Sequence, residues 1–106
     1  MCKTVVLSQK GNTNISICAR CKTFYIWQQS YIMTLNESDY LDFMRHVDKQ
    51  DANGSFSCFP DGEMRLRLNT PAPDIYFTFN EEEWGDFKSA LLESHYMSQV
   101  YALWQS

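Results

Sequence analysis

The most constraining feature of this sequence is a stretch that occurs twice. TLNESDYLDFMRHV, at residues 34–47, returns as TFNEEEWGDFKSAL, at residues 78–91. Each copy passes from a β-favouring run through Asn36 or Asn80 to acidic residues, and then to apolar residues at helical spacing. Asparagine is a preferred helix N-cap, and acidic residues suit the positive end of the helix dipole. Each copy therefore predicts a strand that runs directly into a helix.

The acidic residues after each asparagine have a structural explanation. Glu83 completes a capping box with Asn80, and Asp39 is a shorter equivalent beside Asn36. A metal site made of these carboxylates is the alternative, but helix capping accounts for them without a ligand.

Runs of β-branched and aromatic residues, separated by turn residues, predict the strands. Gly11 and Asn12 mark a hairpin in the first half, and the Pro-Asp-Gly62 turn marks another in the second. A polar linker, DKQDANGS at residues 48–55, separates the halves. The predicted strands cover residues 4–9, 14–18, 22–28, 31–36, 56–59, 63–69 and 75–80, and the predicted helices cover residues 37–49 and begin again at about residue 81.

Both halves follow one plan, in which strands joined by tight turns lead into a helix. We therefore predict an α+β fold with one antiparallel sheet of six or seven strands and two helices on its apolar face. Two tandem strand-strand-strand-helix repeats, residues 1–50 and 54–106, would form the single domain expected for 106 residues. The side chains predicted to face the helices are Tyr31, Met33, Leu35, Met64, Leu66, Leu68, Ile75, Phe77 and Phe79, with Phe43 and Phe87 packed against them.

The opposite face of the second half carries polar and aromatic side chains. Hairpin geometry predicts that Arg67 lies opposite Tyr76 and that Arg65 lies opposite Thr78. An arginine beside a tyrosine could bind an anion or a base, although ordinary cross-strand packing is the favoured explanation.

The strongest chemical signal is the Cys18-Ala-Arg-Cys21 motif, at the turn between two predicted strands. Two thiolates at such a turn can converge on one zinc ion, as in a zinc knuckle. If Gln9 pairs with Asn14, the hairpin register places Cys2 opposite the end of this motif. The sequence therefore predicts that Cys2, Cys18 and Cys21 lie together.

Other candidate ligands are weaker. Cys58 shares a predicted face with Phe56 and is expected in the core as a small hydrophobic residue. His46 and His95 lie on different predicted helices. Three interpretations of the cysteines stay open: a structural zinc site, reduced thiols without a chemical role, and a redox pair. The redox pair is least favoured, because such motifs normally open a helix.

Composition limits the partners and the compartment. The net charge of −4 argues against general binding to nucleic acid, which requires a basic surface. Lys3, Lys10, Arg20 and Lys22 could form a small basic patch, but a solvated edge is the simpler interpretation. No apolar run is long enough for a membrane span or a signal peptide, so we expect a cytoplasmic protein.

The Met-Cys2 start, the Cys18-x-x-Cys21 pair and LNESDYLDF, at residues 35–43, resemble a family of short bacterial proteins known only as a domain of unknown function. The resemblance covers about residues 1–47. It implies a bacterial cytosolic protein that uses its cysteine triplet as a unit. It implies no activity, substrate or catalytic residue.

The second predicted helix continues beyond the length of the first, and its apolar pattern changes sides. Positions that would continue the core-facing stripe hold small or polar residues: Ser94, His95, Ser98 and Ala102. Large apolar residues lie on the opposite side of a straight helix: Met97, Val100, Tyr101 and Trp104. The helix could bend and tuck this tail back, but no proline that would cause a kink is present. We therefore expect residues 96–104 to bury against a second copy in a homodimer.

The sequence contains no G-x-S-x-G, no Gly-rich phosphate loop and no H-E-x-x-H motif. Two classes of function remain. The favoured one is a small protein-interaction or scaffold module, stabilised by zinc if the cysteines form a site. The alternative is a small thiol or redox enzyme that uses Cys18 and Cys21.

Overall fold

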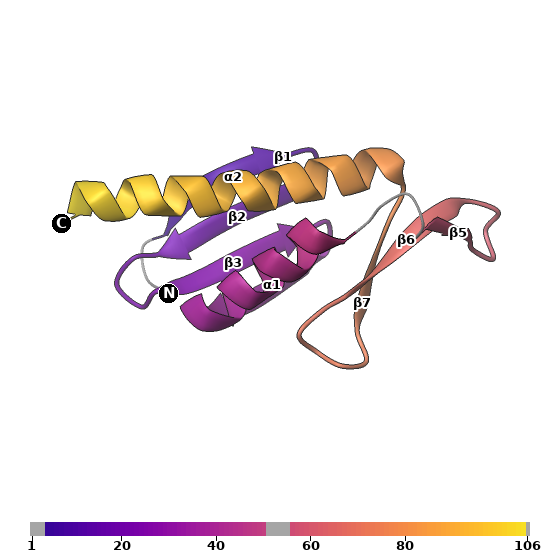
Figure 1. Ribbon diagram of the computed structural model, residues 1–106, viewed down its shortest axis with the longest axis horizontal. Coiled ribbons are helices and arrows are strands. Elements are labelled where there is room, and N and C mark those ends of the chain that lie inside the picture. Colours follow the sequence, from indigo (N-terminus) through magenta and orange to yellow (C-terminus); the bar gives the residue numbers. More distant parts are fainter. Residues whose placement is uncertain (1–3, 51–55, 106) are drawn as a thin grey trace.

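The computed structural model describes residues 4–50 and 56–105 and confirms the α+β class (Figure 1). All predicted strands and both predicted helices are present within these residues, and their ends differ from prediction by at most one residue. The elements are β1 (Val5–Lys10), β2 (Thr13–Cys18), β3 (Thr23–Gln28), β4 (Tyr31–Asn36), α1 (Glu37–Lys49), β5 (Phe56–Cys58), β6 (Met64–Asn69), β7 (Tyr76–Phe79) and α2 (Glu81–Gln105).

The strands form two antiparallel sheets, and the prediction of a single sheet was wrong. The first sheet has the order β1-β2-β3-β4, and the second has the order β5-β6-β7. Turn signals identify hairpin partners along the chain, but they do not specify whether two groups of strands share an edge. Here β4 runs directly into α1, and the second sheet packs against α2 instead of β4. The equivalence of the two halves as a repeat stays a prediction.

Both helices lie on one face of the first sheet (Figure 1). Helix α2 packs across β1 and β2, whereas α1 packs against β3 and β4 and beside α2. In the part of the chain that the structure describes, neither helix combines the length and hydropathy that a membrane span requires. Strand alternation turns one set of side chains toward the helices, and all of them are buried: Ile15, Ile17, Phe24, Ile26 and Leu35.

A bulge in β1 attaches this strand to α2. Gln9 pairs with Asn14 as predicted, but the register shifts between Val6 and Ser8. Leu7 and Ser8 are consequently both buried, although they are neighbours in a strand. Leu7 joins the hydrophobic core, and the Ser8 hydroxyl donates to the Ala90 carbonyl oxygen of α2 at 2.6 Å.

Phe87 lies at the centre of a core that includes side chains from both sheets and both helices. Its ring centroid lies 6.2 Å from that of Phe43, 5.9 Å from that of Phe77 and 4.7 Å from that of Phe79. The predicted burial of Phe43 and Phe87 is confirmed. These aromatic contacts join the second sheet to the helices, since each ring covers apolar surface of its neighbours.

Three side chains that were predicted to face the helices are exposed: Tyr31, Met64 and Ile75. Each lies at the first residue of its strand or immediately before it, where the helices no longer cover the sheet. The alternation of side chains along the strands therefore predicted which face of each sheet is turned toward the helices. It did not predict how much of that face the helices cover.

The register of β6 and β7 differs from prediction by two residues. Arg67 pairs with Thr78, and Asn69 pairs with Tyr76. Because side chains alternate with a period of two, this shift leaves the predicted faces unchanged. Arg67 still reaches the Tyr76 ring diagonally, with its guanidinium carbon 4.6 Å from the ring centroid.

The predicted caps are confirmed at both helices. Asn36 Oδ1 accepts from the Asp39 amide at 2.7 Å. Asn80 Oδ1 accepts from the Glu83 amide at 2.8 Å, and Glu83 Oε1 accepts from the Asn80 amide at 2.9 Å. Gln29 in the β3–β4 turn also donates to Glu83 Oε2 at 2.9 Å. The capping box of α2 therefore holds the end of the first sheet as well as its own helix.

Two glycines with positive φ offer a test of this packing, because their surroundings differ. Gly11 lies in the β1–β2 turn, and Gly62 lies between β5 and β6. A methyl group at Gly11 (φ 54°) would overlap the Asp86 carboxylate of α2, whereas one at Gly62 (φ 84°) would meet nothing within 4 Å. Gly62→Ala is expected to cost about 1 kcal/mol through its backbone conformation alone. Gly11→Ala is expected to lower the free energy of unfolding by roughly 2–3 kcal/mol, because steric overlap adds to that cost. Urea unfolding measures both variants, and equal losses would contradict the close approach of Gly11 to α2.

Candidate functional site

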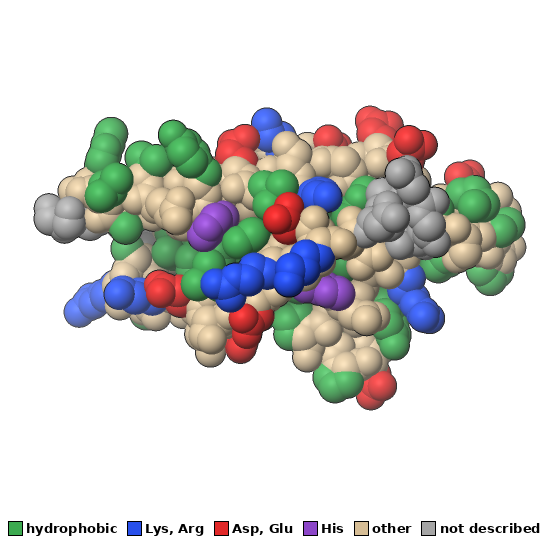
Figure 2. Space-filling view, in the orientation of Figure 1, with side chains coloured by type: hydrophobic (Ala, Val, Ile, Leu, Met, Phe, Trp, Pro, Cys, Tyr) green, Lys and Arg blue, Asp and Glu red, His purple; other side chains and the backbone are tan. Residues whose placement is uncertain are grey.

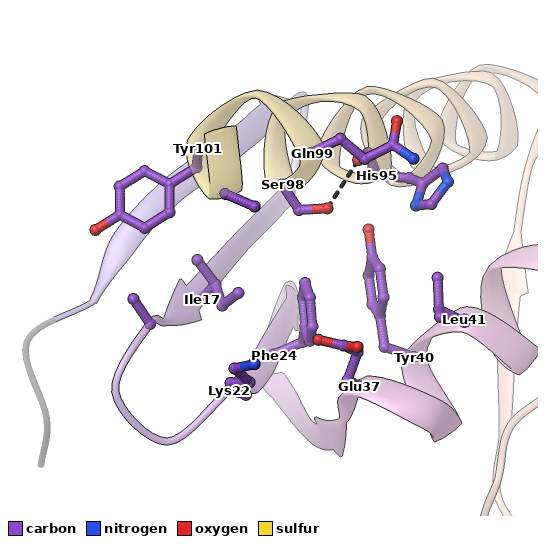
Figure 3. A pocket seen from close by; sticks show the side chains of 12 residues that line it. Ile17, Lys22, Phe24, Glu37, Tyr40, Leu41, His95, Ser98, Gln99 and Tyr101 are labelled. Atoms are coloured by element: carbon purple, nitrogen blue, oxygen red, sulfur yellow. Dashed lines mark hydrogen bonds between the residues drawn. The ribbon is translucent and has the colours of Figure 1, made fainter. Parts of the chain in front are cut away.

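The main candidate site is a cavity of about 450 Å3 between the first sheet and the two helices (Figure 3). The end of β2, the β2–β3 turn and the start of β3 form one wall, with Ile17, Ala19, Lys22 and Phe24. The first turns of α1 form a second wall, with Glu37, Tyr40 and Leu41. The C-terminal part of α2 forms the roof, with His95, Ser98, Gln99, Tyr101 and Ala102.

Two stacked rings separate the cavity from the core. The Phe24 and Tyr40 rings are almost parallel, at an interplanar angle of 6°, and their centroids lie 3.8 Å apart. Alternation along β3 directs Phe24 toward the helices, and the helical repeat places Tyr40 on the inner face of α1. Both rings are buried, so the wall that they form is apolar and fixed by packing.

The Tyr40 hydroxyl forms a buried hydrogen bond with the Ser94 hydroxyl of α2. Ser94 in turn donates to the Leu91 carbonyl oxygen at 2.7 Å. Burial raises the pKa of Tyr40 from 10.0 to about 12, and the bond to Ser94 lowers it by a smaller amount. Tyr40 is therefore neutral at physiological pH, and its hydroxyl is occupied within the protein.

His95 contributes a buried side-chain nitrogen to the roof. Its Nδ1 atom is buried and has no hydrogen-bond partner among the described residues. Ser98, one turn later, donates to the His95 carbonyl oxygen at 2.7 Å, as the dashed line in Figure 3 shows. An unsatisfied buried nitrogen costs free energy, and protein atoms enclose this one.

Opposite charges lie at the mouth of the cavity. Lys22 has a left-handed backbone conformation, with φ 54°, and its amide donates to the Cys18 carbonyl oxygen at 2.7 Å. This bond closes the turn and positions Lys22 beside the cavity. Glu37 lines the same opening from the first turn of α1.

The predicted ligand residues do not form this cavity. Cys18 and Cys21 lie near each other at the β2–β3 turn, where Cys18 is buried and Cys21 is exposed. Ile17 faces the cavity, so alternation directs its neighbour Cys18 to the other face of the sheet. Cys2 lies outside the described residues. Among the described residues, no group of three or more His, Cys, Asp and Glu side chains is placed to hold a metal ion.

The remaining predicted ligands are dispersed. Cys58 is exposed on β5, so its predicted core position was wrong. The reason is that β5 is a three-residue edge strand at the end of the second sheet distant from the helices (Figure 1). His46 is exposed on α1, and His95 lies in the roof of the cavity.

Helix α2 is uninterrupted from Glu81 to Gln105 (Figure 1). Of the predicted interface residues, Met97 and Trp104 are exposed, whereas Val100 and Tyr101 are half-buried. Tyr101 lines the cavity (Figure 3). The sequence pattern missed two other exposed side chains of this segment: Tyr96 and Leu103.

The cavity could have been anticipated from the same pattern. Phe87 and Leu91 fill the inner face of α2, but the positions that continue this face are Ser94, Ser98 and Ala102. A change from large to small residues on a core-facing stripe leaves space that packing would otherwise fill. The same change of pattern led to the prediction of the interface alone.

No family model matches the chain, and neither a curated protein nor a solved structure matches it.

The pKa of Tyr40 predicts how stability depends on pH at the wall of this cavity. The unfolded chain loses the Tyr40 proton near pH 10, whereas the folded chain keeps it to about pH 12. The folded state therefore binds the proton more tightly, and the free energy of unfolding falls as pH rises from 10 to 12. A difference of two pKa units corresponds to roughly 3 kcal/mol.

This dependence is measured by urea unfolding at several values of pH between 8 and 12. Tyr40→Phe is expected to remove most of the fall, because phenylalanine does not ionise. Tyr76→Phe is the matched control, since Tyr76 is exposed, and it is expected to behave as the wild type does. An identical fall in Tyr40→Phe and the wild type would contradict the assignment.

Proposed function

We propose that the protein is an interaction module that pairs with a second copy of itself through the outer face of the end of α2. The observation that carries this proposal is the exposure of large apolar side chains there. Tyr96 is 64% exposed, Leu103 is 74% exposed and Trp104 is 83% exposed. Figure 2 shows hydrophobic side chains gathered over the C-terminal end of this helix.

Two of these side chains, Tyr96 and Leu103, form a stripe with Leu92, whereas Trp104 lies about 100° around the helix from Leu103. Leu92, Tyr96 and Leu103 lie at i, i+4 and i+11, which is one side of a helix with 3.6 residues per turn. Phe87 and Leu91, which pack into the core, lie on the other side. The stripe therefore points away from the domain that the helix covers, and large exposed apolar side chains grouped in this way are typical of an interface.

The charge of this segment favours a second copy as the occupant. Residues 94–105 contain no Asp, Glu, Lys or Arg. In a twofold contact each residue meets the same segment of its partner, so a charged residue would face its own sign. A neutral stripe avoids this repulsion. An antiparallel arrangement also keeps the acidic first turns of the two α2 helices, at Glu81–Glu83, far apart.

The mass in solution tests the proposal. Light scattering at micromolar concentration is expected to give a dimer for the wild type and a monomer for Leu103→Glu, which places like charges in the contact. Ile75→Glu is the matched control, because Ile75 is also an exposed apolar residue but lies before β7. This control is expected to remain dimeric. A monomeric wild type, or a dimer that Leu103→Glu does not weaken, would exclude this interface.

Two cysteines at one closed turn favour a second candidate function, a structural zinc ion held by Cys2, Cys18 and Cys21. The Lys22 amide bond to the Cys18 carbonyl closes the turn that carries Cys18 and Cys21. Cysteine thiolates are preferred ligands of structural zinc, and three of them leave one further ligand to be supplied. A thiol or redox role for Cys18 and Cys21 is the alternative use of the same pair.

Metal analysis of the purified protein separates these possibilities. One zinc ion per chain is expected for the wild type, with loss of the metal in Cys21→Ser. Cys58→Ser is the control, because Cys58 lies on β5, and it is expected to retain the metal. A protein that is purified without zinc and does not take it up would contradict the zinc site and leave the thiol role as the explanation.

A further inference from the structure

We propose that the free edge of β4 binds an extended peptide segment of a partner protein, and that this segment carries a basic residue at its C-terminal end. The segment adds a strand to the first sheet through backbone hydrogen bonds. This inference is independent of the dimer proposed above, because that contact uses the end of α2.

Strand β4 forms one edge of the first sheet. In the part of the chain that the structure describes, β3 is the strand that pairs with it, and α1 packs over the face of the sheet. The other edge of β4 therefore presents backbone amide and carbonyl groups that a further strand can bind. This edge is a template for an extended peptide rather than for a helix.

The opposite edge of the same sheet is protected against such pairing, whereas β4 is not. Strand β1 contains the bulge between Val6 and Ser8, and it ends at Lys10. Bulges and lysine residues are devices by which proteins protect their edge strands. Strand β4 has six residues, YIMTLN, none of which is charged or proline, and its pairing with β3 is regular.

Large apolar side chains are exposed beside this edge. Tyr31 and Ile32 begin β4, and both are exposed. Trp27 of β3 is exposed as well, and it pairs with Ile32 on the face of the sheet opposite the helices. An added strand would cover part of Ile32, and β-branched or aromatic residues on that strand make favourable cross-strand pairs with it.

A cavity of about 520 Å3 adjoins the start of β4. The β3–β4 turn and Tyr31 line one side, and residues 74–78 line the other. Side chains alternate along an extended chain, so these five consecutive residues meet the cavity with an edge rather than with one face. This segment includes the start of β7, which is an edge strand of the second sheet. The end of an added segment therefore has space between the two sheets.

A second copy of β4 fits this position less well than a separate peptide. In an antiparallel pair, the C-terminal end of the added strand lies beside Tyr31. In a second copy that end is Asn36, and α1 begins at the next residue. A helix is about 10 Å wide, whereas paired strands are about 4.8 Å apart, so the helix cannot follow the edge into the cavity. A peptide that stays extended can do so.

The charge of the cavity favours a basic residue at the end of the segment. Asp74 is exposed, and it is the charged side chain among the described residues that line the cavity. Arg67 stacks on the Tyr76 ring but does not line the cavity. A lysine or arginine that follows the residue opposite Tyr31 would be attracted to Asp74, whereas a glutamate there would be repelled.

The probe for this proposal is an acetylated and amidated heptapeptide in which valine and threonine alternate and the last residue is lysine. NMR titration of the wild type is expected to show saturable shifts of the β4 amides and slower hydrogen exchange at those amides. The same peptide with glutamate as its last residue is expected to bind about fivefold more weakly, because it loses the attraction of Asp74. A version with proline at its centre is expected not to bind, since proline removes a backbone donor.

Three variants locate the site. Ile32→Lys places a charge on β4 and is expected to weaken binding about tenfold. Val6→Lys is the matched control, because Val6 is an exposed apolar residue of β1, at the opposite edge of the same sheet, and it is expected to bind as the wild type does. Asp74→Lys is expected to reverse the preference, so that the peptide ending in glutamate binds more tightly than the one ending in lysine.

Several results would overturn the proposal. These are the absence of saturable binding, shifts that are confined to α2 or β1, equal binding of the peptides ending in lysine and glutamate, or wild-type affinity in Ile32→Lys. Slow exchange of all β4 amides before peptide is added would also overturn it, because a second copy would then occupy the edge. If Ile32→Lys does not fold, the exchange of preference in Asp74→Lys decides.

Discussion

The burial of β1 and β2 by α2 is the contact on which the rest of this structure depends. A helix is about 10 Å wide and neighbouring strands are about 4.8 Å apart, so one helix covers about two strands. Helix α1 follows β4 directly and covers β3 and β4. The apolar side chains of β1 and β2, including Leu7 and Ile15, are therefore buried only because α2 lies across them.

This requirement also positions the second sheet. Strand β7 leads directly into α2, so the position of the helix also fixes the positions of β7 and of its neighbour β6. Phe87 then contacts Phe43 of α1 as well as Phe77 and Phe79 of β7. The Phe87 ring of α2 thus connects α1 with β7 of the second sheet. Glu83, in the first turn of α2, binds Gln29 of the first sheet. Two sheets without a shared edge become one folded unit through a single helix.

Local features of the fold could be predicted from the sequence because their causes are local. The caps at Asn36 and Asn80, the strand ends and the buried Phe43 and Phe87 follow from side-chain chemistry and from spacing. The separation into two sheets could not be predicted, since it depends on how a helix packs against distant strands. The same limit applies to the candidate site. Ser98 and Ala102 could have indicated space beneath α2, although no cavity was predicted from them, and Phe24 and Lys22, which complete the cavity, come from a distant part of the chain.

The path of α2 has a consequence for the order in which the protein can fold as it is synthesised. The hydrogen bond between Ser8 and Ala90 joins residues 82 positions apart, and it belongs to the contact that covers the first strands. A ribosome that has completed α1 has therefore produced a sheet whose β1–β2 half is still uncovered. Contacts between distant residues form slowly, and partly made chains with exposed apolar surface aggregate readily. Until α2 is complete, the apolar side chains of β1 and β2 lack the helix that covers them in the folded protein.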